Sequence, residues 1–196
     1  MNRFTTSIRA SLASNNWFPA LFMSLALPDI CGALESPDRP VGDRYKDWFN
    51  RYLREKYNPN SAYEALLAVS PDSLHGFPAD IIERMRNQPA LPNTAFTAED
   101  CYRLRCKCLH QGLPERIGND RIHFTSPDPS GRLTVHRNCI NGVLQISIDQ
   151  FCLDVCRAVE KWVTDHSNNQ EIMARSAELI KVYDLDDNEL PIVSYR

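Results

Sequence analysis

Arg105 and His110, with four residues between them, are the pair in this chain whose residue types and spacing best suit chemistry. A guanidinium is permanently charged and can hold two oxygens of a phosphate, while an imidazole can take up and release a proton near neutral pH. The segment from Asp100 to Gly112 is predicted to be a helix, and at about 100° per residue Arg105 falls within its apolar stripe, beside Leu104. Because arginine cannot give up its charge, we expect this side chain to require a buried acceptor.

Asp29 is the acceptor that the earlier part of the chain offers. It continues the apolar row of Phe22 and Leu25 on a helix predicted to begin at Trp17. Opposite charges on the buried sides of two helices predict an ion pair between Asp29 and Arg105. Such a pair is seldom retained for stability alone, since an apolar replacement is often neutral or better.

The segment Arg105-Cys-Lys-Cys-Leu-His110 resembles the motif of the HEPN superfamily (higher eukaryotes and prokaryotes nucleotide-binding). Catalytic members carry an arginine and a histidine, four to six residues apart, at the end of a bundle helix. Asp29, or alternatively Glu35, is similar in position to a polar residue that many members carry on the preceding helix. Cys106 departs from the family, in which asparagine is frequent at this position, so a polar role there is left open.

The resemblance implies a mainly α fold, a HEPN-like helical bundle that takes up residues 1–196 as a single domain. The segments that carry the resemblance are 17–35 and 97–112, with 149–166 as the last long helix of the bundle. A small antiparallel β-meander is expected as an insertion at about residues 119–148, and residues 168–196 as a C-terminal extension.

RNA cleavage that needs neither a metal nor a cofactor is the activity that the resemblance implies. His110 would take the proton of a 2′-hydroxyl and Arg105 would stabilise the charge that develops on the phosphate. Asp29 and Cys106 would support the arginine. The expected products carry a 2′,3′-cyclic phosphate and a 5′-hydroxyl, and the expected setting is stress, toxin action or antiviral defence, with an antitoxin or regulator as a partner.

A homodimer follows from the angle between the two side chains. On an ideal helix His110 falls about 140° from Arg105, so we expect that one chain does not aim both at one phosphate. Catalytic members of the superfamily are dimers in which two motifs face each other, and the resemblance therefore implies a homodimer with one composite site.

Two other readings of the motif stay open. The same pocket could bind a nucleotide or a partner without catalysis, since a fold does not determine activity. Alternatively, Arg105 and Asp29 could form a purely structural pair. A zinc site is not expected, because ligands spaced as Cys101, Cys106, Cys108 and His110 on one helix do not converge tetrahedrally.

The net charge of −3 excludes a broad electrostatic coat for nucleic acid, so RNA binding must depend on a few placed cations. Such a local patch, or alternatively scattered surface charge, is expected from Arg84, Arg86, Arg103, Lys107, Arg116 and Arg121. The aromatic row Tyr45, Trp48, Phe49 and Tyr52 is assigned to the core, and the charged residues interleaved with it, Arg44 among them, to a solvated face. For His123 and His136 the sequence identifies no partner.

The helices and strands that must position these residues are predicted from the periodicity of hydrophobic residues and from the residues that break or end helices and strands. Helices are expected at 2–13, from 17 with a kink or a split at Pro28, at 43–57, 61–69, 97–112 and 149–166, with Asp149 as the cap of the last. A long connection with one helical turn is expected at 70–93, and strands at 121–125, 133–137 and 143–148.

Composition indicates a soluble globular protein, because 43% of the 196 residues are hydrophobic and 24% are charged. The segment from Trp17 to Leu27 is the most apolar, and it is too short and interrupted to predict a membrane span or a signal peptide. Seven cysteines without a regular spacing suggest free thiols. A cytoplasmic protein is therefore expected.

Overall fold

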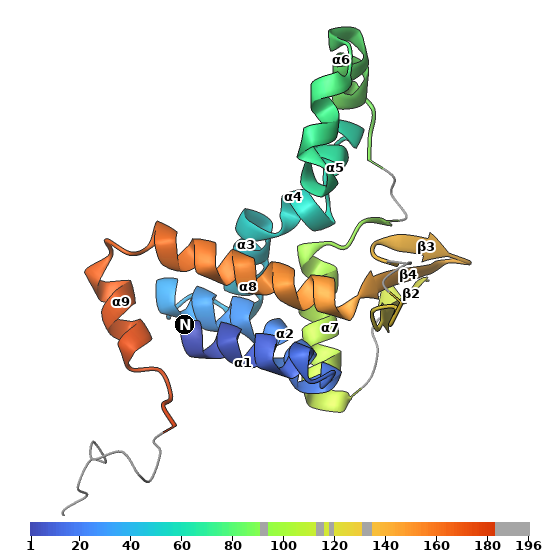
Figure 1. The fold of residues 1–196 in the computed structure, drawn as a ribbon. Helices are drawn as coiled ribbons and strands as arrows, with labels where there is room; N and C mark the ends of the chain where they lie inside the picture. The colour runs from blue at the N-terminus through green and yellow to red at the C-terminus, as the bar shows by residue number, and fades with distance from the viewer. Residues whose placement is uncertain (91–93, 113–115, 118–119, 131–134, 183–196) are drawn as a thin grey trace, which may run out of the picture.

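The computed structural model describes residues 1–90, 94–112, 116–117, 120–130 and 135–182, and it is mainly helical with a small sheet (Figure 1). The helices are α1 (Asn2–Ala13), α2 (Trp17–Glu35), α3 (Val41–Tyr52), α4 (Arg54–Tyr57), α5 (Ala62–Val69), the 3-10 helix η1 (Pro71–Gly76), α6 (Ala79–Asn87), α7 (Ala98–Gln111), α8 (Ile148–Asp165) and α9 (Gln170–Ala177). The strands are β1 (Arg116–Ile117), β2 (Asp120–Thr125), β3 (Asn138–Ile140) and β4 (Val143–Ser147).

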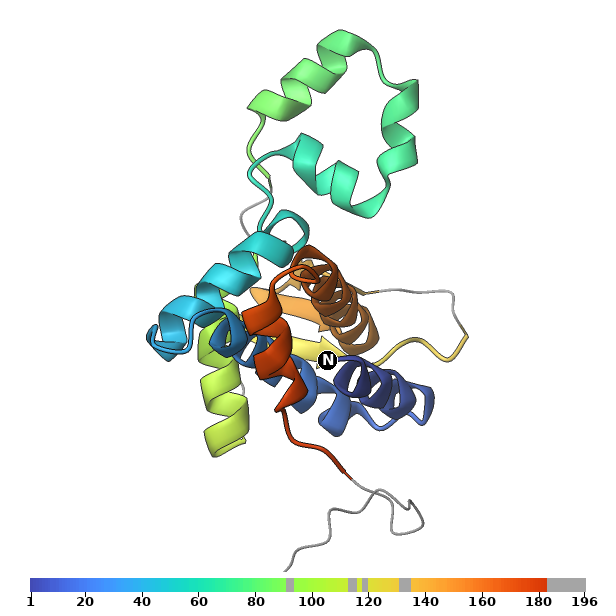
Figure 2. The ribbon, with the colours of Figure 1, turned by 90° about the vertical axis from the view of Figure 1, so that its left-hand side faces the viewer.

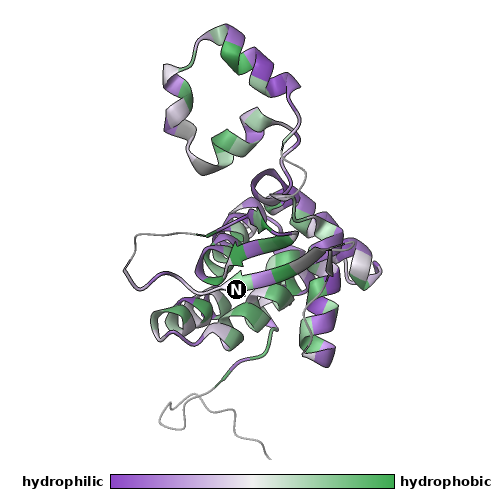
Figure 3. Ribbon diagram, turned by 90° about the vertical axis from the view of Figure 1, so that its right-hand side faces the viewer, coloured by the Kyte–Doolittle hydropathy of each residue, from purple (hydrophilic) through white to green (hydrophobic). Residues whose placement is uncertain are grey.

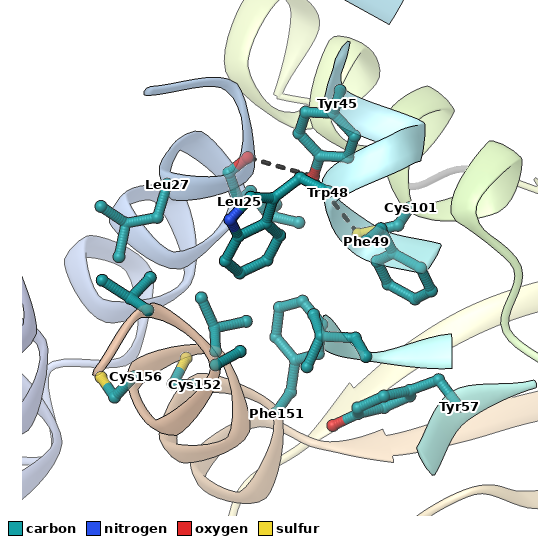
Figure 4. Close-up of a cluster of buried hydrophobic side chains, with 14 of the residues drawn as sticks. Leu25, Leu27, Tyr45, Trp48, Phe49, Tyr57, Cys101, Phe151, Cys152 and Cys156 are labelled. Atoms are coloured by element: carbon teal, nitrogen blue, oxygen red, sulfur yellow. Dashed lines mark hydrogen bonds between the residues drawn. The ribbon is translucent and has the colours of Figure 1, made fainter. Parts of the chain in front are cut away.

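Helix α2 is the centre of the bundle, because α1, α3, α7 and α8 all pack against it (Figures 1 and 2). The core between them is aromatic, with Trp48, Phe49, Phe151 and Trp162 fully buried. Figure 4 shows three of these rings, Trp48, Phe49 and Phe151, in one cluster with the cysteines of α7 and α8. Most of the aromatic row on α3 is therefore core, as predicted from its helical spacing.

Pro28 lies inside α2 without dividing it, so of the two alternatives expected there, a kink or a split, the split is wrong. The helix of 19 residues reaches a mean hydropathy of 1.5, which by length and composition alone is enough to cross a membrane. The sequence expectation counted only uninterrupted apolar residues and missed this. Half of the apolar window is buried inside the structure, where α2 packs against α1, α3, α7, α8 and α9.

The sheet has the strand order β1-β2-β4-β3, and its central pair, β2 and β4, is parallel. The expected antiparallel meander is therefore wrong. The alternation of hydrophobic and polar residues predicts strands but not the direction in which they pair. Ile122 of β2 and Leu144 of β4, for example, are partners in the parallel register. The chain crosses over after β2 and forms β3 at the far edge, returning to β4 through Asn141 and Gly142, both with positive φ. The expected strand at 133–137 lies partly outside the described residues, and β3 begins at Asn138.

Helices α5 and α6, with η1 between them, form an arm that projects from the bundle (Figures 1 and 2). Its base is closed where the amide of Ala62 donates to the carbonyl of Gln88 at 2.9 Å. The expected connection with a single helical turn is wrong, because Pro71 and Pro78 stand at helix starts, where proline is tolerated. No residue of α6 is buried, and hydrophilic and hydrophobic positions alternate along the arm (Figure 3).

Candidate functional site

A buried tyrosine, Tyr45 of α3, fixes three helices relative to one another. Its hydroxyl donates to the carbonyl oxygen of Leu25 on α2 at 3.1 Å and lies 3.3 Å from the Sγ of Cys101 on α7 (Figure 4). Burial raises the pKa of this phenol well above its usual range and that of the Cys101 thiol to about 12, so both groups are neutral. One uncharged hydroxyl therefore sets the register of α2, α3 and α7.

Three charged side chains, those of Asp29, Arg44 and Arg105, meet beside this contact. Arg44 is next to Tyr45 in the chain, and Asp29 and Arg105 each lie one helical turn from a residue that the tyrosine hydroxyl contacts. The carboxylate of Asp29 accepts from Arg105 through Oδ2, with Nη2 at 3.0 Å, as the sequence predicts. Its other oxygen, Oδ1, accepts from Nε and Nη2 of Arg44 at 3.1 and 3.0 Å. The three side chains are 15 to 17% exposed, so the network lies at the edge of the core rather than in free solvent.

Arg44 is the site residue that sequence reasoning missed, and its assignment to a solvated face is wrong. Helix α3 approaches α2 closely at Gly32, where a Cβ atom would lie 3.0 Å from the carbonyl oxygen of Arg44 and 3.1 Å from its Cγ. This approach brings Arg44 onto Asp29. Its Nη1 also donates to the carbonyls of Pro37 and Arg39 at 3.2 and 3.4 Å. A glycine three residues after the aspartate was the available signal.

Arg105 and His110 are brought together within one chain. Nη1 of Arg105 lies 3.4 Å from Nε2 of His110, so the expectation that they point to different sides is wrong. The long arginine side chain spans the angle that separates the two Cα positions. Helix α7 begins with a capping box formed by Thr97 and Asp100. It ends at Gly112, whose φ of +65° stops the helix and leaves His110 exposed in the last turn.

Cys106 lies beside the arginine, with its Sγ 4.0 Å from Nη1 of Arg105, a weak contact. Tyr102 adjoins it, and burial, followed by the nearby Cys106, raises the pKa of this phenol. Cys101 faces the core while Cys106 faces the arginine, so the cysteines of α7 diverge. Among the described residues no cluster of three potential metal ligands occurs.

Glu35, the alternative acid, lies in a different cluster. It accepts from Nη2 of Arg51 at 2.6 Å and from the indole of Trp162, and its carboxylate is 3.7 Å from His166. Asp29 is therefore the acid that meets Arg105.

The expected basic patch is divided by the fold. Arg84 and Arg86 lie on α6 in the projecting arm (Figure 1). The guanidinium of Arg86 stacks on the ring of Tyr63. Arg103 and Lys107 are exposed on α7. The side chains of Arg116 and Arg121 lie outside the described residues, so the positions that the structure places near the candidate site are those on α7.

An apolar cavity of about 670 Å³ lies beside the C-terminal half of α7. Phe18 and Phe22 line it in an edge-to-face pair, together with Trp17, Cys108 and His123. Phe18 is 71% exposed and Phe22 37% exposed, so the start of the apolar row on α2 faces this cavity rather than the core.

The described geometry places an exposed imidazole and an orienting carboxylate each within hydrogen-bonding reach of the same permanent cation, Arg105. The cluster holds two guanidinium charges against one carboxylate, so it carries a local positive charge on an acidic protein. Such an arrangement can hold an oxyanion and exchange a proton beside it. Comparison with models of protein families, with curated proteins and with solved structures gave no match to this chain.

Proposed function

We propose that this chain is a metal-independent endoribonuclease of the HEPN type. The supporting observation is the contact of Arg105 with both partners at once: Nη2 lies 3.0 Å from Asp29 and Nη1 lies 3.4 Å from Nε2 of His110. The carboxylate orients the guanidinium, and the guanidinium stands beside an imidazole, a side chain that can accept and release a proton.

In the proposed reaction, Nε2 of His110 accepts the proton of a 2′-hydroxyl. The 2′-oxygen forms a bond to the adjacent phosphorus, and the bond from phosphorus to the 5′-oxygen breaks. The leaving oxygen takes up a proton, from imidazolium or from water, and the products are a 2′,3′-cyclic phosphate and a 5′-hydroxyl. Arg105 donates to the phosphate oxygens, whose charge increases in the transition state.

Substrate binding would also change the pairing of the histidine. In the free chain Nη1 of Arg105 lies 3.4 Å from Nε2 of His110. A phosphate is a stronger acceptor for this cation than an imidazole, so it would draw Nη1 away. The lone pair of Nε2 then becomes free to act as the base.

One chain already brings Arg105 and His110 together, so a homodimer is not needed to join these two side chains. We propose a homodimer for a different reason. A two-fold axis beside α7 would place a second cluster opposite the first and enclose the RNA between them. Light scattering of the purified chain tests this, and a monomer that cleaves RNA would rule it out. Stress or defence against viruses in the cytoplasm, controlled by an antitoxin or regulator, is the setting that we propose.

The test of the activity is cleavage of labelled RNA by the purified chain in EDTA. Wild type should yield cyclic-phosphate ends, and His110→Ala and Arg105→Ala should each lose about a hundredfold or more in rate. His75→Ala, which removes an exposed histidine of η1, is the matched control and should retain full activity. A wild type that is inactive on diverse RNAs, or an active His110→Ala variant, would contradict the proposal.

A non-catalytic nucleotide-binding module is the second candidate, and the apolar cavity favours it. Aromatic side chains such as Phe18 and Phe22 can stack on a base. This candidate expects RNA or nucleotide binding without cleavage, and an affinity that His110→Ala leaves unchanged.

A further inference from the structure

A second group of polar side chains surrounds a cavity of about 540 Å³ between α4, α5, β3 and the start of α8. Its lining contains two alanines of α5 and five polar residues, Lys56, His136, Arg137, Asn138 and Gln150. It shares no described residue with the Asp29–Arg105 cluster.

Two carboxylates lie at this lining. Asp149 accepts from the side-chain amide of Gln150 at 3.2 Å, and the oxygens of Asp154 are already occupied by other donors. The side chain of Asp154 is 2% exposed, and it accepts from Nζ of Lys56 at 2.6 Å, from the hydroxyl of Tyr57 at 3.0 Å and from Arg157. Neither carboxylate forms an ion pair with Arg137 among the described residues, since Asp154 pairs with Lys56 and Arg157.

Arg137 is the unbalanced charge. Among the residues that the structure describes, none forms a hydrogen bond or an ion pair with it, and its Nε is buried without an acceptor. Burial lowers the pKa of this guanidinium. The backbone holds the residue at a φ of +59°, in the left-handed region that an arginine seldom adopts. A strained, partly buried cation without a partner costs free energy, and such strain concentrates at binding sites.

His136 supplies a second unmatched donor. Its Nδ1 accepts from the amide of Ser147 at 3.2 Å, and burial lowers its pKa to about 4, so the ring is neutral with its proton on Nε2. Nε2 is buried and has no acceptor among the described residues. His136 and Arg137, which both line the cavity, thus each carry a buried N–H group without an acceptor among the described residues.

We propose that this cavity binds the phosphate group of a small phosphorylated molecule, held by the guanidinium of Arg137 and the Nε2–H of His136, with Lys56 adding charge. A phosphate matches this lining better than a planar carboxylate does. Its oxygens point in four directions and can meet donors from separate elements, and its charge can balance two cations. The volume of the cavity exceeds that of a phosphate ion, which leaves room for an organic part of the size of a nucleoside.

The test is calorimetric titration of the full chain with inorganic phosphate and, separately, with adenosine 5′-monophosphate. Wild type should bind both. Arg137→Gln should weaken binding about tenfold to a hundredfold, the value of one charge-assisted hydrogen bond. Arg84→Gln, the same change at an exposed position of the arm, should bind as wild type does. Tighter binding of the monophosphate would place the organic part in the cavity, and equal affinities would restrict recognition to the phosphate itself.

Stability separates a ligand site from a structural role. Without ligand, Arg137→Gln should melt no lower than wild type, because the substitution removes an unpaired buried cation. His136→Asn is the second variant of this test. The asparagine Oδ1 can replace Nδ1 as the acceptor for the amide of Ser147, while the Nε2 donor is lost. We expect it to weaken phosphate binding as well.

Three results would overturn the proposal: no binding of either probe at millimolar concentration, unchanged binding in both variants, or a lower melting temperature of Arg137→Gln with unchanged affinity. Arg105→Gln distinguishes the two sites. If it abolishes phosphate binding while Arg137→Gln does not, phosphate binds at α7, which refutes this proposal and leaves the ribonuclease proposal standing.

Discussion

Asp29 and Arg105 are 76 positions apart in the chain, yet Oδ2 of the aspartate lies 3.0 Å from Nη2 of the arginine. The same carboxylate holds Arg44 through its second oxygen. Both arginines therefore depend on the same carboxylate, that of Asp29. A change at Asp29 affects α2, α3 and α7 together, whereas a change at either arginine leaves one ion pair intact.

Asp29→Asn should consequently be the most damaging single-atom change at the site. Two guanidiniums would remain at the edge of the core with one neutral oxygen, and the amide would direct N–H donors at one of them. We expect the free energy of unfolding to fall by about 2–3 kcal/mol, somewhat less than for a fully buried pair, and RNA cleavage to fall with it. Urea denaturation measures the first effect. Asp38→Asn, at an exposed position, is the control, and equal stabilities of the two variants would refute the shared-carboxylate account.

Arg105→Lys separates the charge from the geometry. Lysine retains the positive charge but is a point donor, so it cannot contact Asp29 and a phosphate with two separate nitrogens. We expect stability within about 1 kcal/mol of wild type, because one ion pair can persist, and a cleavage rate lower by on the order of a hundredfold. Arg103→Lys, two residues earlier on the exposed side of α7, should leave the rate unchanged. A fully active Arg105→Lys would show that charge alone suffices.

Gly32→Ala tests the close approach of α3 to α2, which brings Arg44 into contact with Asp29. A Cβ atom 3.0 Å from a backbone oxygen cannot be accommodated by a side-chain rotation, so α3 must move away from α2. Overpacking of this kind costs about 1–3 kcal/mol. Gly76→Ala is the matched control, because its Cβ would meet no atom within 4 Å. Thermal unfolding of both variants measures the difference, and a Gly32→Ala variant as stable as Gly76→Ala would mean that the helices tolerate separation.

The helical parts of the site could be predicted from the sequence, since Asp29 and Arg105 each interrupt an apolar stripe of their own helix. Arg44 could not, because its place depends on how closely two helices approach, which periodicity does not encode. The contact of Arg105 with His110 was missed for a different reason: angles between Cα positions ignore the reach of a long side chain. Similarly, alternation located β2 and β4, but their parallel pairing depends on a crossover whose path is tertiary.

The low pKa of His136 makes the stability of the fold depend on pH over a defined range. Burial is the main cause, with the charges of Arg137 and Lys56 acting in the same direction and those of Asp154 and Asp149 opposing it. The ring titrates near pH 4 in the folded chain and near 6.5 when unfolded, so between these values the unfolded state binds more protons. Stability should therefore be constant above about pH 6.5 and decrease towards pH 4, by up to about 3 kcal/mol from this residue.

His136→Asn isolates this contribution, because the carboxylates that also titrate in this range remain in both proteins. Urea denaturation from pH 4 to 7 should show that wild type loses stability more steeply than the variant as the pH falls. At pH 7 the ring is neutral in both states, so the difference between the two proteins there reflects packing and the bond to Ser147 alone. Parallel pH profiles would mean that the ring gains a proton in the folded state as readily as in the unfolded chain, which is incompatible with an imidazole buried beside an unpaired guanidinium.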